Sequence, residues 1–521
     1  MSETTGERVR TAEVIGSLCL ATDLGMWFPF EHGLHSNLIT MRLCDALGVD
    51  SETASQTYYV SLLLHVGCTT DGERQTQIFY GSATQSGMHG KLYANPWEMA
   101  SSFASNLFSM VSDPEAGLPT RLRQAAVRVP RMVRVRVDHF TAYCEVSEMV
   151  ADGVGLPPAI STIFALVTER WDGLGQLRRA RGEAIPLPLR IAVVGADAAY
   201  HRLWGDDDYV VETIANRGGH AFDPAVTTAF VDNAADVLGP AKAPESAFEE
   251  VLAAEPRPWF TLENEAIDRA LLTMGSFADL ASPYLSGHAS GVGELASDAA
   301  RLVGWDDAEM ARTRRAGYLH DIGRTGVDPR IWTNEGSLSA DEWEQVRLHP
   351  YHTQRVLAPS PVLSSLADIA CSHHERLDGS GYHRSVPASA QSPPARLLAA
   401  ADAFWAKTER RAYRDALSFE DAAKSVVVKA EQGKLDSHAV AAVVEAAGQT
   451  PPTIERPAGL TEREVQVIGL LARGRQTKQI ARELEISVKT ADSHIQNAYR
   501  KMGVSTRASA TLFAAEHGLV A

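Results

Sequence analysis

Apolar residues recur every three or four positions along most of this 521-residue chain, which is the spacing of amphipathic helices. Residues 10–50 show this pattern and stop at Gly48, as expected of a helix end. Residues 57–66 form a further apolar run, and from Leu262 onward the pattern is helical throughout. The chain is therefore predicted to be all-α.

The helical pattern and its polar landmarks occur twice. The repeated landmarks are His32 and His288, Gly48 and Gly304, His65 and His320, Glu169–Gly175 and Glu375–Gly381, and Asp197 and Asp402. Repetition in the same order predicts an internal duplication. The first copy would carry an insertion near residues 72–140.

Proline-rich stretches mark the expected domain boundaries. The predicted parts are a first copy at residues 1–240, a linker at 241–260, a second copy at 261–447, a linker at 448–458 and a C-terminal module at 459–521.

The first copy is chemically poorer than the second. Val66 follows its histidine where the second copy has Asp321, and Val167 and Thr168 replace a His-His pair. The polar residues that remain are His32, His65 and Asp197. We interpret them as buried residues of a structural pseudo-domain, with a retained ligand pocket as the alternative.

Charge is distributed unevenly. The net charge is −16, but residues 455–521 hold ten Lys or Arg against seven Asp or Glu. A basic module on an acidic body is typical of a protein that meets phosphate at one end. A second basic run, at residues 121–136, is interpreted as a solvated face.

Cysteine usage and hydrophobicity indicate the compartment. The five cysteines are scattered without CxxC spacing, which favours reduced thiols rather than disulfides. The N-terminus has no secretory pattern, and no apolar run approaches the ~18 residues of a membrane span. A cytoplasmic protein is expected.

Seven potential metal ligands lie between residues 288 and 402. They are His288, His320, Asp321, His349, His373, His374 and Asp402. Imidazoles and carboxylates suit Mn, Fe or Zn. Neighbouring residues on a helix point about 100° apart, so a His-His pair suits two adjacent metals better than one.

Each ligand has an expected place in the helical pattern. His288 should lie on one helix, and His320 and Asp321 near the end of the next. His349 should follow a helix that Ser339–Glu342 opens with a capping box. The His-His pair should end a third helix, and Asp402 should project from a fourth.

With these motifs, residues 262–447 resemble HD-domain metal-dependent phosphohydrolases, specifically the HD-GYP subfamily of cyclic-dinucleotide phosphodiesterases. Residues 10–238 resemble a degenerate form. The resemblance implies that the seven residues ligate two divalent metal ions (Fe, Mn or Zn). A hydroxide that bridges the ions would attack phosphorus.

The resemblance also implies roles beside the metals. Asp321 and Arg324 would be catalytic, and Arg411, Arg414 and Tyr382 would bind the substrate.

The chain departs from the family pattern at four positions. Arg324 replaces a lysine, His383 a proline, Trp405 an aspartate, and Tyr284 the glutamate that holds a third metal in some members. Two metals are therefore expected, and the departures leave open whether catalysis is retained.

The C-terminal module is predicted to contain a helix-turn-helix. A Thr461–Glu464 capping box opens the first helix, which ends at Gly474. Thr477 would cap a second helix that runs to Glu485. Ser487 would cap a third, which stops at Gly503. Residues 458–519 resemble the LuxR/GerE-type DNA-binding domain.

This resemblance implies a tetrahelical module that contacts double-stranded DNA, with its recognition helix in the major groove. The predicted DNA-binding residues are Arg475, Ser487, Lys489, Thr490, Ser493, His494, Asn497 and Lys501. Because single modules of this type usually bind paired half-sites, a homodimer is expected.

Three functions fit these observations. The first is a transcription regulator whose second copy is a two-metal phosphodiesterase for a nucleotide signal such as a cyclic dinucleotide. In the second, an inactive HD domain senses a nucleotide or metal and controls DNA binding. In the third, the helical body only oligomerises the DNA-binding module.

Overall fold

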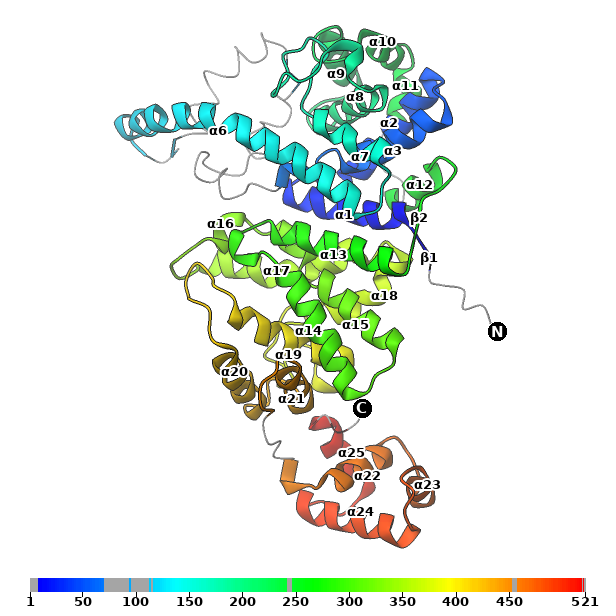
Figure 1. The fold of residues 1–521 in the computed structure, drawn as a ribbon, viewed down its shortest axis with the longest axis vertical. Coiled ribbons are helices and arrows are strands. Elements are labelled where there is room, and N and C mark those ends of the chain that lie inside the picture. The colour runs from blue at the N-terminus through cyan, green and yellow to red at the C-terminus, as the bar shows by residue number, and fades with distance from the viewer. Residues whose placement is uncertain are drawn as a thin grey trace. The chain divides into compact units, whose positions relative to one another are not determined.

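The computed structural model describes residues 8–69, 93–94, 112–113, 116–240, 246–451, 457–517 and 519. Helices make up most of the described residues (Figure 1), which confirms the all-α prediction. In this part of the chain the only sheet consists of β1 (Arg8–Arg10) and β2 (Thr261–Glu263). These strands pair antiparallel, with Val9 opposite Leu262. The pattern after Leu262 thus begins as a strand rather than a helix.

The first copy is built around three buried helices, α2, α3 and α8. Its elements are α1 (Thr11–Gly25), α2 (His32–Leu47), α3 (Ser51–Leu63), η1 (Val66–Thr69), α6 (Leu118–Gly153), α7 (Pro158–Ser161), η3 (Thr162–Leu166), η4 (Gly182–Ala184), α8 (Leu187–His201), α9 (Asp207–Arg217), α10 (Pro224–Asp232) and α11 (Ala234–Leu238). Gly48 ends α2 at a φ of 62°, a value that glycine adopts without strain.

The second copy repeats this helical plan. Its elements are α13 (Glu265–Asp279), η5 (Pro283–Leu285), α14 (His288–Val303), α15 (Asp307–Leu319), η6 (Ile322–Gly326), α16 (Pro329–Trp332), α17 (Ala340–Leu357), α18 (Pro361–Ala370), η7 (Ala388–Ala390), α19 (Pro393–Thr408), α20 (Phe419–Glu431) and α21 (Ser437–Ala446). The capping box of Ser339 and Glu342 opens α17, as predicted.

The repetition extends to individual hydrogen bonds. Helices α2 and α14 are both 16 residues long and begin at a histidine. The Asp23 carboxylate accepts from the N–H of Gly33 at 3.0 Å, and Asp279 accepts from the N–H of Ala289 at 2.9 Å. Both carboxylates hold the first turn of the helix that follows. The next helices, α3 and α15, are both 13 residues long and are both capped by an aspartate.

Helix ends correct one pairing between the copies. The last residue of α3 is Leu63, and the last residue of α15 is Leu319. The next position is therefore Leu64 in the first copy and His320 in the second. His65 then corresponds to Asp321, and it is not the counterpart of His320 that the sequence comparison suggested.

Ion pairs correct a second pairing. Arg190 pairs with Asp223 at 2.5 Å, and Arg396 pairs with Asp436 at 3.2 Å in the second copy. Because the two arginines form equivalent ion pairs, they show which residue of α8 corresponds to which residue of α19. Asp197 follows its arginine by seven residues, whereas the second-copy aspartate follows by six. One residue turns a helix by about 100°, so Asp197 faces another direction.

The segment expected to link the copies, residues 241–260, contains a packed helix. Residues 247–254 form α12 (Ala247–Ala254), and Phe248 is 1% exposed. The Phe248 ring lies where a side chain at Gly16 on α1 would stand. Residues 241–245 of this segment lie outside the described residues. So do residues 72–92, 95–111 and 114–115 of the expected insertion and the side chains of 129–136 in the basic run.

The C-terminal module has four helices, α22 (Glu462–Ala472), α23 (Thr477–Glu483), α24 (Val488–Met502) and α25 (Arg507–Glu516), after a short turn, η8 (Pro457–Gly459). The Thr461 capping box and the Ser487 cap are present as predicted. The predicted cap of α23 is wrong, because Gln476 and Gln479 form the capping box there. This helix ends at Glu483, two residues early.

We predict that the C-terminal module loses stability in acid through Glu464. Burial opposes ionisation of Glu464, but hydrogen bonds from Lys501 and Thr461 outweigh it and lower the pKa below the ordinary value of 4.5. This contribution is complete above about pH 4.5 and is lost as the pH falls through the lower folded value. Thermal unfolding of residues 457–521 at several pH values measures it.

The Glu464→Gln variant should be less stable at pH 7 and should lose that part of the acid dependence. Glu483→Gln, which changes an exposed carboxylate, is the control and should behave like the wild type. An unchanged pH profile in Glu464→Gln would contradict the assignment.

Candidate metal centre and nucleic-acid interface

Asp321 is the buried carboxylate at the centre of one group of ligands. It follows α15 and is 1% exposed. Its Oδ2 lies 3.3 Å from Nε2 of His288, the first residue of α14. Its Oδ1 lies 3.1 Å from Nε2 of His349 on α17. Arg324 of η6 reaches Oδ2 at 2.5 Å. Two imidazoles and one guanidinium therefore surround a single carboxylate.

A second group of ligands surrounds Asp402 on α19. Its Oδ1 lies 3.9 Å from Nε2 of His320, and its Oδ2 lies 3.7 Å from Nδ1 of His374. The His373 ring lies 4.7 Å from that of His320 and 4.1 Å from that of His374, centroid to centroid. Three imidazoles thus gather beside one carboxylate.

Backbone carbonyls orient three of the histidines. Nδ1 of His320, His349 and His373 lies 2.6 Å from the carbonyl oxygen of the residue three positions earlier. A carbonyl can only accept, so Nδ1 must carry the proton in each ring. The Nε2 lone pair is then available to a cation, which is the usual arrangement for metal-binding histidines.

His349 lies inside α17 rather than after a helix. The helix continues through Pro350 to Leu357. Proline lacks an N–H, so the carbonyl of Val346 receives no helical hydrogen bond from position 350. The His349 ring donates to this carbonyl instead. Pro350 therefore leaves free the acceptor that orients the histidine.

The distances between ligand atoms, taken without regard to which carboxylate each imidazole contacts, divide six of the seven residues into two groups of three. One group is His288, His320 and Asp321, and the other is His349, His373 and His374. Within each group the atoms lie within 4.8 Å of one another. Ligands about 2.0–2.2 Å from a shared cation have comparable separations, so both groups fit a metal of the Mn, Fe or Zn type.

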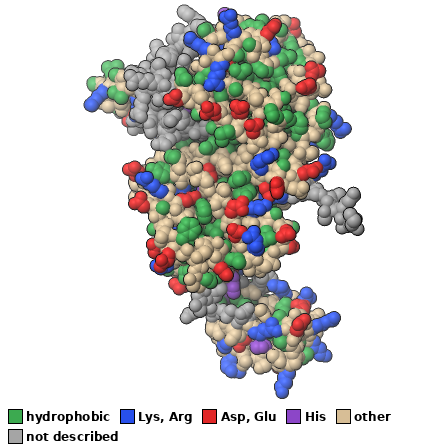
Figure 2. Space-filling view, viewed as in Figure 1, with side chains coloured by type: hydrophobic (Ala, Val, Ile, Leu, Met, Phe, Trp, Pro, Cys, Tyr) green, Lys and Arg blue, Asp and Glu red, His purple; other side chains and the backbone are tan. Residues whose placement is uncertain are grey.

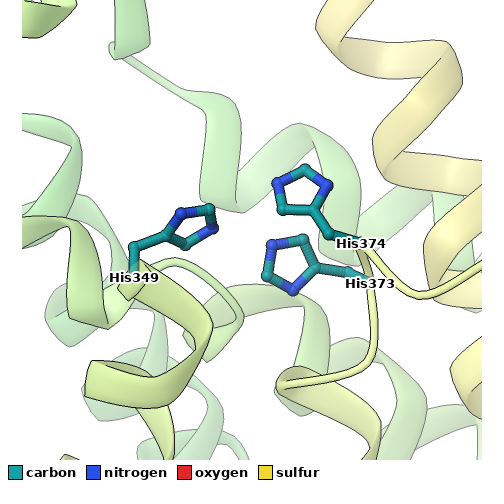
Figure 3. Close-up of side chains that lie close together, drawn as sticks. All are labelled: His349, His373 and His374. Carbon is teal, nitrogen blue, oxygen red and sulfur yellow. The ribbon is translucent and has the colours of Figure 1, made fainter. Parts of the chain in front are cut away.

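The His-His pair stands in a turn rather than on a helix. Helix α18 ends at Ala370, and residues 371–374 form the turn. Figure 3 shows both rings beside His349. The 100° separation expected on a helix therefore does not apply, and both imidazoles belong to one group of ligands.

The predicted substrate residues have partners in the protein. Arg411 donates to the carbonyl of Tyr284 at 2.7 Å. Arg414 donates to the carbonyls of Ala406, Lys407 and Asp415. Its guanidinium thus caps the end of α19, an arrangement that competes with phosphate binding. The ring of Tyr382 lies 4.6 Å from the His374 ring.

Sequence reasoning missed two supporting residues. Trp332 lies 5.3 Å from the Arg324 guanidinium, which stacks over its ring, and 6.5 Å from the His349 ring. Asp279 holds the first turn of α14, where His288 stands. Its signal was present, because Asp23 and Asp279 precede their helix-starting histidines by the same number of residues.

The corresponding place in the first copy is filled by other groups. Phe28 lies 4.4 Å from the His32 ring and 6.0 Å from the His65 ring. Asp197 accepts two hydrogen bonds from Arg217, at 2.6 and 2.7 Å. An aromatic ring therefore stands near both histidines, and Asp197 is neutralised by an arginine, which favours the pseudo-domain interpretation.

Helix α24 presents a polar face opposite a buried one. Ala491, Ile495 and Ala498 are buried. Lys489 and Ser493 are exposed, and His494 and Asn497 are half-buried. Ser487 and Thr490 are exposed at the helix start, where the Ser487 hydroxyl caps the helix at the Thr490 N–H. These residues lie together as predicted.

Two further predicted DNA-binding residues, Lys501 and Arg475, already bind acidic side chains of the module. Lys501 binds the Glu464 carboxylate at 2.6 Å and the carbonyl of Gly459 at 2.9 Å, so it supports the fold of the module. Arg475 pairs with Glu483 at 3.0 Å. Figure 2 shows several further Lys and Arg side chains on the visible surface of the module, and Lys478 and Arg482 are exposed on α23.

None of the described helices is long and apolar enough to cross a lipid bilayer.

We predict that Pro350→Ala weakens metal binding. The new N–H at position 350 can donate to the Val346 carbonyl. It would then compete with the His349 ring for that acceptor. Loss of such a supporting hydrogen bond typically lowers metal affinity about 10-fold or more. Competition with a fluorescent chelator measures the affinity for Mn²⁺.

Pro361→Ala, at the first position of α18, is the matched control and should bind metal like the wild type. Equal affinities in both variants would contradict the role of Pro350.

Comparisons with known proteins agree with these features. Residues 273–439 match the HD domain family, and residues 458–514 match the family described as bacterial regulatory proteins, luxR family. The 3′3′-cGAMP-specific phosphodiesterase 3 of Vibrio cholerae is 27% identical over 420 residues, which cover 79% of this chain and 89% of that protein.

Two further proteins are similar to this chain, one over a short segment and the other over most of its length. A cyclic di-GMP phosphodiesterase of Thermotoga maritima is 34% identical over 152 residues, 29% of this chain and 41% of that protein. A crystal structure of a cyclic GMP-AMP-specific phosphodiesterase from V. cholerae shares the fold, with a TM-score of 0.58 at 22% identity, over 85% of this chain and 99% of that one. The chain therefore carries an HD domain followed by a domain of the luxR family of bacterial regulators.

Proposed function

We propose that this protein is a cytoplasmic transcription regulator whose HD domain hydrolyses a phosphodiester of a nucleotide signal, such as a cyclic dinucleotide. The observation that carries the proposal is the convergence of five imidazole side chains around the carboxylates of Asp321 and Asp402. The substrate class is suggested by relatives named as cGAMP and cyclic di-GMP phosphodiesterases.

The seven residues would hold two divalent cations. Each group offers Nε2 atoms freed by backbone anchoring of Nδ1, and Asp321 offers both oxygens. When bound, two such cations would supply a hydroxide nucleophile at neutral pH and stabilise negative charge on the phosphoryl oxygens. Among hard to borderline metals, Fe, Mn and Zn fit this donor set.

The chain's own residues would orient the reacting groups. Arg324, held over Trp332, fixes the Asp321 carboxylate by an ion pair. Tyr382 would lie beside a bound nucleotide, because its ring stands next to His374. Arg411 donates to the carbonyl of Tyr284, and it would bind phosphate by exchanging its present partners for phosphate oxygens.

The alternative is an HD domain that binds a nucleotide or metal without turning it over. Two observations favour it. Arg324 replaces the lysine of the family pattern and already pairs with Asp321, and Arg414 is engaged by backbone carbonyls. Ligand occupancy would then control DNA binding only if the two conformations bind the ligand with different affinity.

We predict that His320→Ala combined with Asp321→Ala abolishes metal binding and phosphodiesterase activity. The double variant removes two of the three ligands of the group formed by His288, His320 and Asp321. Metal analysis of the purified chain and turnover of 3′3′-cGAMP and cyclic di-GMP measure the two properties. Loss of turnover by at least 10³-fold is expected, in line with removal of charge stabilisation at a transition state.

The matched control combines His438→Ala with Asp341→Ala, which changes an exposed histidine and an exposed aspartate. Bound metal without turnover in the wild type would favour the sensor. Absence of metal from a wild-type chain that still binds DNA would leave a helical body that only oligomerises the DNA-binding module.

For the C-terminal domain we propose that α24 enters the major groove of double-stranded DNA, with the chain acting as a homodimer on paired half-sites. Lys489, Ser493, His494 and Asn497 would face base edges or phosphates, and the capped helix start at Ser487 would meet phosphate. Arg475 would reach phosphate only by leaving Glu483.

We predict that Lys489→Ala weakens DNA binding. Loss of one phosphate contact should reduce the slope of log affinity against log salt by about 1. Fluorescence anisotropy with duplex DNA at several salt concentrations measures this slope. Lys424→Ala, an exposed lysine on α20, is the control. An unchanged slope in Lys489→Ala would rule out this residue as a phosphate contact.

A further inference from the structure

The first copy contains a cavity that the metal chemistry does not use. It has a volume of about 750 Å³ and lies between α2 and α8. This is within the range of small-molecule sites, about 300–1,000 Å³. Its lining includes Phe30, His35, Leu38, Arg42, Arg202 and Leu238.

Two arginines converge at one point of this cavity. Arg42 and Arg202 each donate through Nη1 to the carbonyl oxygen of Leu238, at 3.3 and 2.8 Å. Two positive groups so close together repel each other unless negative charge offsets them. Arg202 pairs with Asp207, whereas Arg42 has no salt bridge among the described residues. This corner of the cavity is therefore suited to an anion.

The acidic residues of the lining are partly engaged. Asp206, Asp207 and Asp208 stand at the start of α9. The Asp206 carboxylate accepts from the N–H of Tyr209 as the helix cap, and Asp207 pairs with Arg202. Asp206 is thus directed at the helix start and Asp207 at Arg202, whereas Asp208 is exposed to solvent. Arg42 is left to attract a ligand.

The rest of the cavity favours an uncharged ring. Leu38 and Ile39 are buried apolar residues of α2, and Phe30 stands just before that helix. The pKa of His35 is lowered, chiefly by burial and further by Arg202 and Arg42, against an opposing effect of Glu250. A neutral imidazole can both donate and accept hydrogen bonds at the edge of a heterocycle.

We propose that this cavity binds a small organic anion of mononucleotide size, with its phosphate near Arg42 and Arg202 and its ring against Phe30, Leu38 and Ile39. The site would give the first copy a ligand-binding role separate from the metal centre. Its binding step does not rest on the phosphodiesterase activity proposed above.

A contact leads from this cavity to the second copy. The Arg355 guanidinium stacks over the Phe30 ring at 4.0 Å. Arg355 lies on α17, the helix that carries His349, and α17 also packs against α1. The same ring thus lines the cavity and holds α17. A ligand that orders Phe30 would therefore stabilise the helix of a metal ligand.

Isothermal titration of the full chain with 5′-GMP and 5′-AMP, in EDTA to remove divalent cations, tests the site. Guanosine and adenosine, which lack phosphate, are the matched probes. We expect a mononucleotide to bind at one site and to bind at least 10-fold more tightly than its nucleoside, because charge-assisted hydrogen bonds are lost with the phosphate.

Two variants locate this binding. Arg42→Gln should weaken it at least 10-fold, and Leu38→Trp, which fills the cavity, should abolish it. Arg8→Gln changes an exposed arginine of the same copy and should have no effect. No mononucleotide binding, or binding that survives both cavity variants but is lost in Arg411→Ala, would overturn the proposal.

Hydrogen exchange tests the contact with α17. Ligand should slow amide exchange in residues 340–357 of the wild type and of Arg347→Gln, an exposed residue of the same helix. In Arg355→Gln, ligand should bind with unchanged affinity but leave exchange in α17 unaltered. Equal protection in both variants would overturn the proposed route, and since no turnover is measured, the result is independent of catalysis.

Discussion

The second copy depends on how a buried carboxylate is compensated. Asp321 is almost fully removed from water, and an isolated ionised carboxylate there would be very costly. Its neighbours are the Arg324 guanidinium and the imidazoles of His288 and His349. Because these groups come from η6, α14 and α17, the requirement to compensate one charge brings three separate elements to one point.

The two copies meet the same requirement in different ways. In the first copy, Arg217 neutralises the buried Asp197 with two hydrogen bonds, and the Phe28 ring contacts the rings of His32 and His65. An arginine there compensates a buried carboxylate, whereas we assign metal ions to that role in the second copy. The shared helix lengths and aspartate caps show that the two copies have a similar scaffold but different buried polar groups.

Local sequence rules predicted much of the fold. Helix starts at Ser339, Thr461 and Ser487 follow from side chains that cap nearby N–H groups, and such contacts depend only on neighbours in the chain. The spacing of histidines and aspartates also indicated which residues gather. These features are local or repeated, so the printed sequence contains them.

Choices between competing partners could not be predicted. His349 was expected after a helix, but it lies inside α17, where its ring replaces the donor that Pro350 lacks. Arg414 and Lys501 carried charges that suited phosphate, yet nearby carbonyls and Glu464 bind them. The spacing of residues along the sequence does not reveal which of several nearby acceptors a long side chain will contact. The pairing of Leu64 with His320, by contrast, has the same offset as His32 with His288, and the helix ends agree with it.

The most direct test is anomalous X-ray diffraction from crystals of the full chain grown with Mn²⁺, with data collected on both sides of the manganese absorption edge. Our account predicts two anomalous peaks in the second copy, bonded to side chains among His288, His320, Asp321, His349, His373, His374 and Asp402, and none beside Asp197. No peak at those residues, or a peak held by the first copy alone, would contradict it.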